Sequence, residues 1–207
     1  MKRGKFEAEK SPKQEKEKQV LSTSQSVLLY LHDLTYLLCI ILLIILLCLR
    51  IVIVSGDSMN NTLVDGDYVL LLSNSFYHNP KQGDIIVASK DSFRSGEPII
   101  KRIIAVEGQK VDIDFYNGIV YVDDVALDEP YICSKTDLNE GIIFPLVVEE
   151  GCVFVLGDNR AKSEDSRSVQ IGMIDNREII GKAIILFFPG DDQGEQIRDF
   201  SRIGGLR

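Results

Sequence analysis

The distribution of apolar residues divides the chain into three parts. Residues 1–33 are polar and rich in lysine, whereas the 21 residues 34–54 carry a single charged side chain, Arg50. A helix of that length spans roughly 30 Å, the thickness of the hydrocarbon core of a bilayer. We therefore predict a transmembrane helix over 34–54, with Arg50 near one end, where its side chain can reach the interface.

Residues 55–207 have the pattern of a β domain, because short runs rich in Ile and Val are bounded by Gly, Asp or Pro. An Asn117-Gly118 pair between two alternating runs predicts a β-hairpin with a type I′ turn within 110–124. The expected fold class is mostly β, with an antiparallel-sheet or barrel-like domain behind one N-terminal transmembrane helix. We expect residues from about 109 to 150 to form a smaller insert that contains the hairpin, and residues 190–207 to form a loose tail. The other predicted strands are Tyr68–Leu72, Asp84–Ala88, Ile99–Val106, Cys152–Leu156 and Lys182–Phe188.

Charge is distributed unevenly about the predicted span. Seven Lys and Arg residues precede it, and none lies between Arg50 and Lys81, which places the N-terminus in the cytoplasm and 55–207 outside. We expect an uncleaved signal anchor, because the basic region is long for a signal peptide and no Ala-x-Ala site follows. Residues 55–207 carry 15 basic and 26 acidic residues, an excess that argues against binding of nucleic acid.

Histidine and cysteine limit the possible chemistry further. The chain has only two histidines, His32 and His78, so a His-dependent catalytic triad or a histidine metal site is disfavoured. Cys133 and Cys152 fall in the predicted exported domain, where a disulfide is possible. Cys152 also lies in the apolar run C-V-F-V-L, which suits a buried thiol equally well, and both alternatives stay open.

Three polar motifs interrupt the apolar runs: S-G-D-S-M-N-N-T-L at 55–63, K-R-I-I-A-V-E-G at 101–108, and G-D-N-R-A-K-S-E-D-S-R at 157–167. Alternation along a strand puts Lys101 and Arg102 on opposite faces, so one of them faces the apolar side. A lysine in an apolar setting loses its proton near neutral pH and can act as a general base. Taken singly, the motifs also fit a turn serine, a water-facing edge-strand lysine and a solvated loop.

Together, and in this order behind a single span, the three motifs resemble those of bacterial type I signal peptidases, which are membrane-bound Ser–Lys proteases. The resemblance covers about residues 34–190, and G-D-I-I-V at 83–87 matches a further family box. The third motif matches completely. The departures are Asn61 at the position of a family proline, and Ala105, Glu107 and Gln109 at those of Gly, Pro and Asp in the base motif.

The resemblance implies a role for each matching residue. Ser58 corresponds to the nucleophile and Lys101 to the general base. Ser163 corresponds to the serine that orients this lysine, Asp165 and Arg167 to a supporting ion pair, and Gly56 with the Ser58 amide to the oxyanion region. No metal and no organic cofactor are implied.

The resemblance also implies the substrate, a preprotein cleaved after an Ala-x-Ala sequence. The preprotein would lie as an added strand, so that its P1 and P3 side chains enter one apolar surface together. By motif position this surface includes Val54 and Ile100. Two alternatives remain, a relative of SOS-type autoproteases and a catalytically inactive, membrane-anchored binding domain. A relative of the SOS-type autoproteases would need a DNA-binding helix-turn-helix in place of the 34–54 span, and none is visible in the sequence. The intact Ser58, Lys101 and Ser163 disfavour the inactive binding domain.

Overall fold

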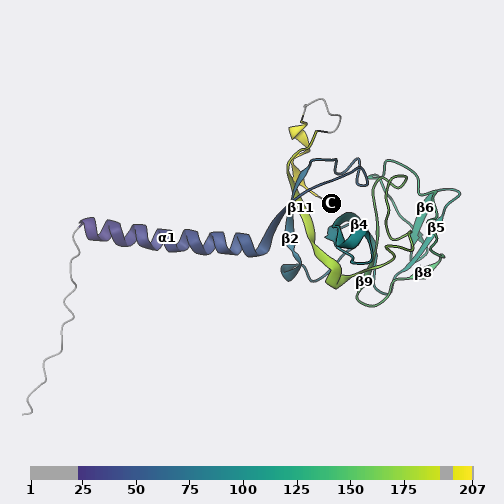
Figure 1. Ribbon diagram of the computed structural model, residues 1–207, viewed down its shortest axis with the longest axis horizontal. Coiled ribbons are helices and arrows are strands. Elements are labelled where there is room, and N and C mark those ends of the chain that lie inside the picture. Colours follow the sequence, from purple (N-terminus) through teal and green to yellow (C-terminus); the bar gives the residue numbers. More distant parts are fainter. Residues whose placement is uncertain (1–22, 192–197, 207) are drawn as a thin grey trace, which may run out of the picture. The chain divides into compact units, whose positions relative to one another are not determined.

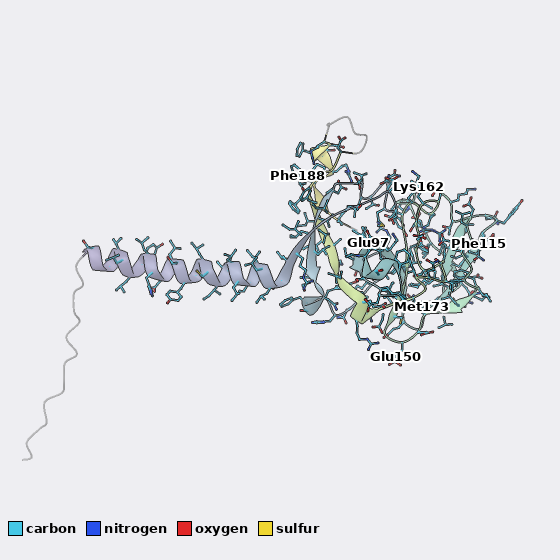
Figure 2. The ribbon with its side chains drawn as sticks, viewed as in Figure 1. Glu97, Phe115, Glu150, Lys162, Met173 and Phe188 are labelled. Atoms are coloured by element: carbon cyan, nitrogen blue, oxygen red, sulfur yellow. The ribbon has the colours of Figure 1, made fainter. Side chains whose placement is uncertain are left out.

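The computed structural model describes residues 23–191 and 198–206 (Figure 1), so most of the predicted basic tail lies outside the described residues. Helix α1 (Thr23–Cys48) is the first element, and apolar side chains project from it all around (Figure 2). Its segment Ser26–Cys48 is long and apolar enough to cross a membrane. At 1.5 Å per residue, these 23 residues extend about 35 Å.

The helix prediction over 34–54 is wrong at both boundaries. Among the described residues, helix α1 covers Thr23–Cys48, and strand β1 (Leu49–Ile53) replaces the expected last turns of the helix. The β-branched residues from Ile51 to Ile53 favour a strand, and β1 pairs along its whole length with β2 (Tyr68–Ser73). Arg50 therefore lies exposed on a strand and not at a helix end.

The prediction of a mostly β domain is confirmed. Within the described residues the larger sheet has the order β1-β2-β11-β3-β4-β9-β10, with β12 paired to β11, and the smaller has the order β7-β6-β5-β8; all pairs are antiparallel. Strands β5 to β8 fall within the predicted insert. The remaining strands are β3 (Ile85–Ala88), β4 (Ile99–Val106), β5 (Lys110–Asp114), β6 (Ile119–Val122), β7 (Val125–Ala126), β8 (Leu146–Val147), β9 (Cys152–Leu156), β10 (Ile174–Asp175), β11 (Ile179–Phe188) and β12 (Gly204–Gly205). Short 3₁₀ turns cover Asn74–Phe76, Arg94–Gly96, Asn176–Glu178 and Phe200–Arg202.

Strands β5 and β6 form the predicted hairpin, but its turn is not of type I′. That turn needs positive φ at both central residues, and here only Gly118, with φ of 74°, adopts it. The Asp114 carboxylate instead accepts hydrogen bonds from the N–H groups of Tyr116 and Asn117, both at 3.0 Å. A pair with positive φ, Asp123 and Asp124 at 52° and 65°, joins β6 to β7.

The larger sheet is covered by apolar side chains on both faces. On the first face, Val87 and Ile100 pack in one cluster with Val54, which comes from the segment after β1. On the second face, Ile86 and Ile99 pack in another cluster, to which Phe93 also belongs. Strands β3 and β4 are thus buried from both sides, which explains why apolar residues occupy all of β3 and all of β4 except Lys101 and Arg102. A third cluster joins the smaller sheet to β4 and β9.

The prediction of a loose tail over 190–207 is wrong for residues 198–206, because these residues pack against the β domain. Strand β12 pairs with β11, and the Leu206 N–H donates to the Ile184 carbonyl at 3.0 Å. The Arg202 guanidinium forms an ion pair of 2.6 Å with the fully buried Asp67. Residues 192–197 and 207 lie outside the described residues.

Cys133 and Cys152 do not form a disulfide, which was one of the two alternatives that the sequence left open. Cys133 is exposed and Cys152 is partly buried, and both are free thiols. Burial raises the pKa of the Cys152 thiol above its usual value, which makes it less reactive as a nucleophile.

Candidate active site

The segment that carries Ser58 follows β1 and is fixed by the loop at 64–67. The Val54 N–H donates to the Asp67 carbonyl at 2.8 Å. Gly56 has φ of 85°, a conformation that favours glycine, and its N–H donates to the Asp65 carboxylate at 2.8 Å. Gly56 therefore shapes the turn, and its amide is already bonded within the protein. Within the described residues, the Ser58 N–H has no hydrogen-bond acceptor.

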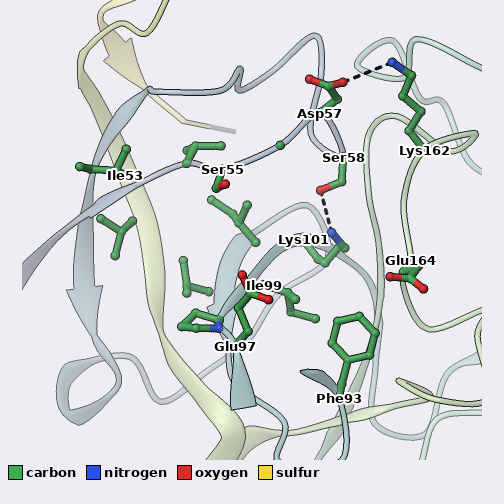
Figure 3. Close-up of a pocket in the computed structure, with 16 residues that line it drawn as sticks. Ile53, Ser55, Asp57, Ser58, Phe93, Glu97, Ile99, Lys101, Lys162 and Glu164 are labelled. Atoms are coloured by element: carbon green, nitrogen blue, oxygen red, sulfur yellow. Dashed lines mark hydrogen bonds and ion pairs between the residues drawn. The ribbon is translucent and has the colours of Figure 1, made fainter. Parts of the chain in front are cut away.

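Ser58 and Lys101 lie in direct contact, although 43 positions separate them in the sequence. Lys101 projects from β4, and its Nζ lies 2.8 Å from the Ser58 Oγ (Figure 3). The lysine side chain is buried, with 4% of the residue exposed, whereas Ser58 is partly exposed. Since burial penalises the charged ammonium, this position favours the neutral amine that a general base requires.

Both basic residues of β4 are buried, where the sequence indicated only one. Arg102 is compensated by Asp158, whose two carboxylate oxygens accept from the guanidinium Nε and Nη2 at 2.8 and 2.7 Å. The guanidinium also lies 4.0 Å from the centre of the Tyr131 ring. A buried charge with this many partners is tolerated in the interior, so Arg102 ties β4 to the loop at 157–167.

The loop at 157–167 is held together by the predicted pair of Asp165 and Arg167. Arg167 Nε donates to Asp165 Oδ1 at 2.8 Å, and both side chains are fully buried. The guanidinium also donates to the carbonyls of Arg160 and Ser163, at 2.7 and 3.1 Å. Asp165 in turn accepts from the Gly157 N–H at 3.1 Å. The pair therefore crosslinks the loop from within.

Ser163 lies inside this loop, and its hydroxyl makes no hydrogen bond to Lys101, the residue that the resemblance implied it orients. Its Oγ is buried and has no hydrogen-bond partner within the described chain. Gly157 packs closely here, since a Cβ at Gly157 would lie 2.2 Å from the Ser163 Oγ and 2.5 Å from the Ser58 carbonyl. Only glycine allows the two segments to approach this closely.

Asn159 was not singled out from the sequence. Its backbone N–H donates to the Ser58 carbonyl at 3.0 Å, and its side-chain Nδ2 donates to the Asp57 carbonyl at 3.0 Å. Asn159 thus joins the third motif to Ser58 and to Asp57, the residue before it. Beside it, Lys162 forms an ion pair with Asp57 at 3.2 Å (Figure 3).

Ser58 and Lys101 both line a cavity of about 580 Å³. Val54 and Ile100, the residues expected to contact the substrate, both line it. Within the described residues, no group of three or more His, Cys, Asp and Glu side chains is arranged to hold a metal ion. The rest of the lining is Val52, Ile53, Ser55, Gly56, Asp57, Val87, Phe93, Glu97, Pro98, Ile99, Lys162 and Glu164.

Comparison with known proteins agrees with the motifs. Residues 28–188 match the family model described as signal peptidase, peptidase S26. The chain is 39% identical over 150 residues to a probable signal peptidase I-1 of Synechocystis sp., covering 69% of this chain and 72% of that protein. Signal peptidase I of Bacillus licheniformis is 31% identical over 145 residues, covering 66% and 75%.

Among solved structures, a signal peptidase I from Enterococcus faecalis is 30% identical, with a TM-score of 0.41, and the match covers 51% of this chain and 97% of that one. The family assignment rests on the family model and the sequence relatives, which match most of the chain. The chain belongs to the signal peptidase I family of the S26 peptidases, serine endopeptidases that remove signal peptides from preproteins.

Proposed function

We propose that this chain cleaves signal peptides with a Ser58–Lys101 dyad. The observation that carries the proposal is the 2.8 Å contact between the Ser58 Oγ and the buried Lys101 Nζ at the wall of a cavity. Neutral Lys101 accepts the Ser58 proton as the Oγ attacks the scissile carbonyl. The proton then passes to the leaving amine as the peptide C–N bond breaks.

The resulting ester between Ser58 and the signal peptide is hydrolysed by water, with Lys101 again accepting a proton. The negative oxygen formed in each step needs a hydrogen-bond donor. The Ser58 N–H is the donor we assign, because the Gly56 N–H is engaged by Asp65. Asp165 and Arg167 support the dyad by holding the loop that packs against Ser58, and we place Ser163 in the same supporting role.

The substrate is proposed to bind as a strand beside β4. Ile99 and Ile100 pair with β3 on one side, whereas pairing with β9 begins only at Arg102. The open edge of β4 faces the cavity, whose other wall is formed by residues 52–58. An extended peptide can add to such an edge through its main chain. Its P1 and P3 side chains then point to Val54 and Ile100, whose branched side chains leave room for alanine.

The proposal is tested with the full-length protein in detergent and a precursor that carries an Ala-x-Ala site. We expect a single cut after the second alanine, read by N-terminal sequencing of the product. The control precursor carries Phe at P1 and should stay intact. Cleavage elsewhere, or equal cleavage of both precursors, would contradict the proposed specificity.

Shortening the side chains that form the cavity wall should relax the preference for alanine at P1 and P3. Ile100→Ala, alone or with Val54→Ala, enlarges the P1 and P3 surface while leaving Ser58 and Lys101 in place. Such changes in a pocket shift discrimination by about 10- to 200-fold, measured as relative kcat/KM for Leu against Ala at P1. Ile180→Ala, in the same apolar cluster but not at the cavity, is the matched control. An active double variant with unchanged alanine preference would show that these residues do not contact P1 or P3.

Activity should increase with pH. The ammonium form of Lys101 has no lone pair and cannot accept the Ser58 proton, so the enzyme is inactive when this lysine is protonated and active when it is neutral. The logarithm of kcat/KM should therefore rise with a slope of one along the limb where Lys101 ionises. Near-UV circular dichroism at each pH checks that the fold is unchanged. A flat profile between about pH 5 and 9 would argue against a lysine base.

We further propose that α1 spans the lipid bilayer, with the N-terminus in the cytoplasm and residues 55–207 outside. The support is the apolar length of Ser26–Cys48 and the seven basic residues that precede it. Protease added to intact spheroplasts should digest a tag on residues 55–207 and spare a tag on the N-terminus. Digestion of the N-terminal tag alone, before lysis, would establish the opposite orientation.

A further inference from the structure

The cavity reaches both faces of the larger sheet at the open edge of β4. Side chains of paired residues share a face, so Ile100 lies with Val87 and Ile99 lies with Ala88. The cavity is lined by Val54, Val87 and Ile100 from the first face. It is also lined by Ile99 and Phe93 from the second face. A strand bound at this edge would therefore contact protein on both of its sides.

Phe93 is held in this position by the loop between β3 and β4. Its N–H donates to the Lys90 carbonyl at 2.9 Å, and its carbonyl accepts from the Gly96 N–H at 3.0 Å. The Ser89 hydroxyl donates to the Gly96 carbonyl at 2.7 Å. The aromatic residue is 4% exposed and packs in the cluster of Ile99, and Figure 3 shows it on the other side of Ile99 from Ile53. The loop thus presents a fixed aromatic wall to the cavity.

We propose that Phe93 and Ile99 form a wall that contacts the P2 side chain of the preprotein. This inference rests on the proposed function, in which P1 and P3 point to the first face. Successive side chains of a strand point to opposite faces, so P2 then points to the second face. An apolar wall with little exposed surface accepts an apolar P2 residue of limited size and excludes a large aromatic one by overlap.

The test uses precursors with alanine at P1 and P3 and either Ala or Phe at P2, cleaved by the full-length protein in detergent. Phe93→Ala should raise kcat/KM for the Phe precursor relative to the Ala precursor by about 10- to 200-fold over the wild-type ratio. Ile99→Ala should raise it in the same direction and guards against poor folding of the Phe93 variant. Ile171→Ala, in the same apolar cluster but not at the cavity, should leave the ratio unchanged.

The outcomes separate this inference from the function on which it rests. If the wild type does not cleave the precursor with Ala at all three positions, the proposed function fails. If the wild type and both variants cleave it at the same bond, but the P2 ratio stays within twofold or falls in both variants, only the P2 wall is wrong. A ratio raised equally by Ile171→Ala would also overturn it, because the effect would then be a general loosening of the core.

Discussion

Ser58→Ala and Lys101→Met are each expected to lower kcat/KM for precursor cleavage by about 10⁴- to 10⁶-fold, the range found when one member of a catalytic unit is removed. The two side chains are 2.8 Å apart, and neither can perform the proton transfer and attack without the other. Because they act as one unit, the double variant should be hardly slower than either single variant. Product formation over long incubations, quantified by mass spectrometry, measures the residual rate.

The substitution of Lys101 by Met keeps the length of the buried side chain and removes only the amine. Lys182→Met is the matched control, because Lys182 also has a partly buried amine but does not line the cavity. It should retain nearly full activity. If the Lys101→Met variant folded normally and its kcat/KM were within tenfold of the wild-type value, the general base would be another group.

Asp165→Ala should give the largest loss of stability among the substitutions considered. Removing one partner of a buried ion pair typically costs about 3–5 kcal/mol in the free energy of unfolding, because the other charge stays buried without compensation. Here Arg167 would keep, among the described residues, only its longer ion pair with Glu140, at 3.6 Å, and the Gly157 N–H would lose its acceptor. Urea denaturation of the protein in detergent, followed by near-UV circular dichroism, measures the effect on the β domain.

Two variants show whether burial of the pair causes this loss. Arg177→Met breaks the ion pair with Asp175, in which the arginine side chain is 90% exposed, and should change the midpoint little. The double variant Asp165→Asn with Arg167→Met removes both buried charges and should unfold at higher urea than Asp165→Ala. Equal midpoints for Asp165→Ala and Arg177→Met would show that the buried pair has no special importance for stability.

The strands that could be predicted best are those buried on both faces. The bounds predicted for Ile99–Val106 and Cys152–Leu156 match β4 and β9, since each is rich in Ile, Val and other apolar residues and has clear ends, although Lys101 and Arg102 interrupt the first. The boundary between α1 and β1 could not be predicted in the same way. Residues 49–53 continue the apolar run of the helix apart from Arg50, and their β-branched residues become a strand by pairing with β2, 15 or more residues further on.

The type of turn in the hairpin also depended on information outside the local pattern. Asn-Gly pairs favour a type I′ turn, but the side chain of Asp114 bonds to the next N–H groups and stabilises a longer loop. The two consecutive residues with positive φ are Asp123 and Asp124, in the next turn, between β6 and β7. Here the side-chain hydrogen bonds of a neighbouring residue outweigh the preference of the Asn-Gly pair.

For the candidate site, the sequence singled out Ser58 and Lys101 because their motifs are characteristic of a family, and the structure places the two side chains in contact. It did not reveal Asn159, whose bond to Asp57 joins residues 102 positions apart. Phe93 escaped notice for a different reason, since it lies in an irregular loop where no periodicity indicates which way a side chain points. Residues that act through long-range contacts or from loops become visible only in three dimensions.

The ion pair of Arg202 with Asp67 also has a consequence for the order in which the protein matures. Asp67 is fully buried, and its carboxylate accepts hydrogen bonds from the Val64 and Gly190 N–H groups as well as from Arg202. The backbone of the same residue holds Val54, four positions before Ser58. During synthesis, this turn acquires its last partner only when residues 198–206 have been made. A growing chain therefore carries Ser58, the proposed nucleophile, long before it carries the completed support for it.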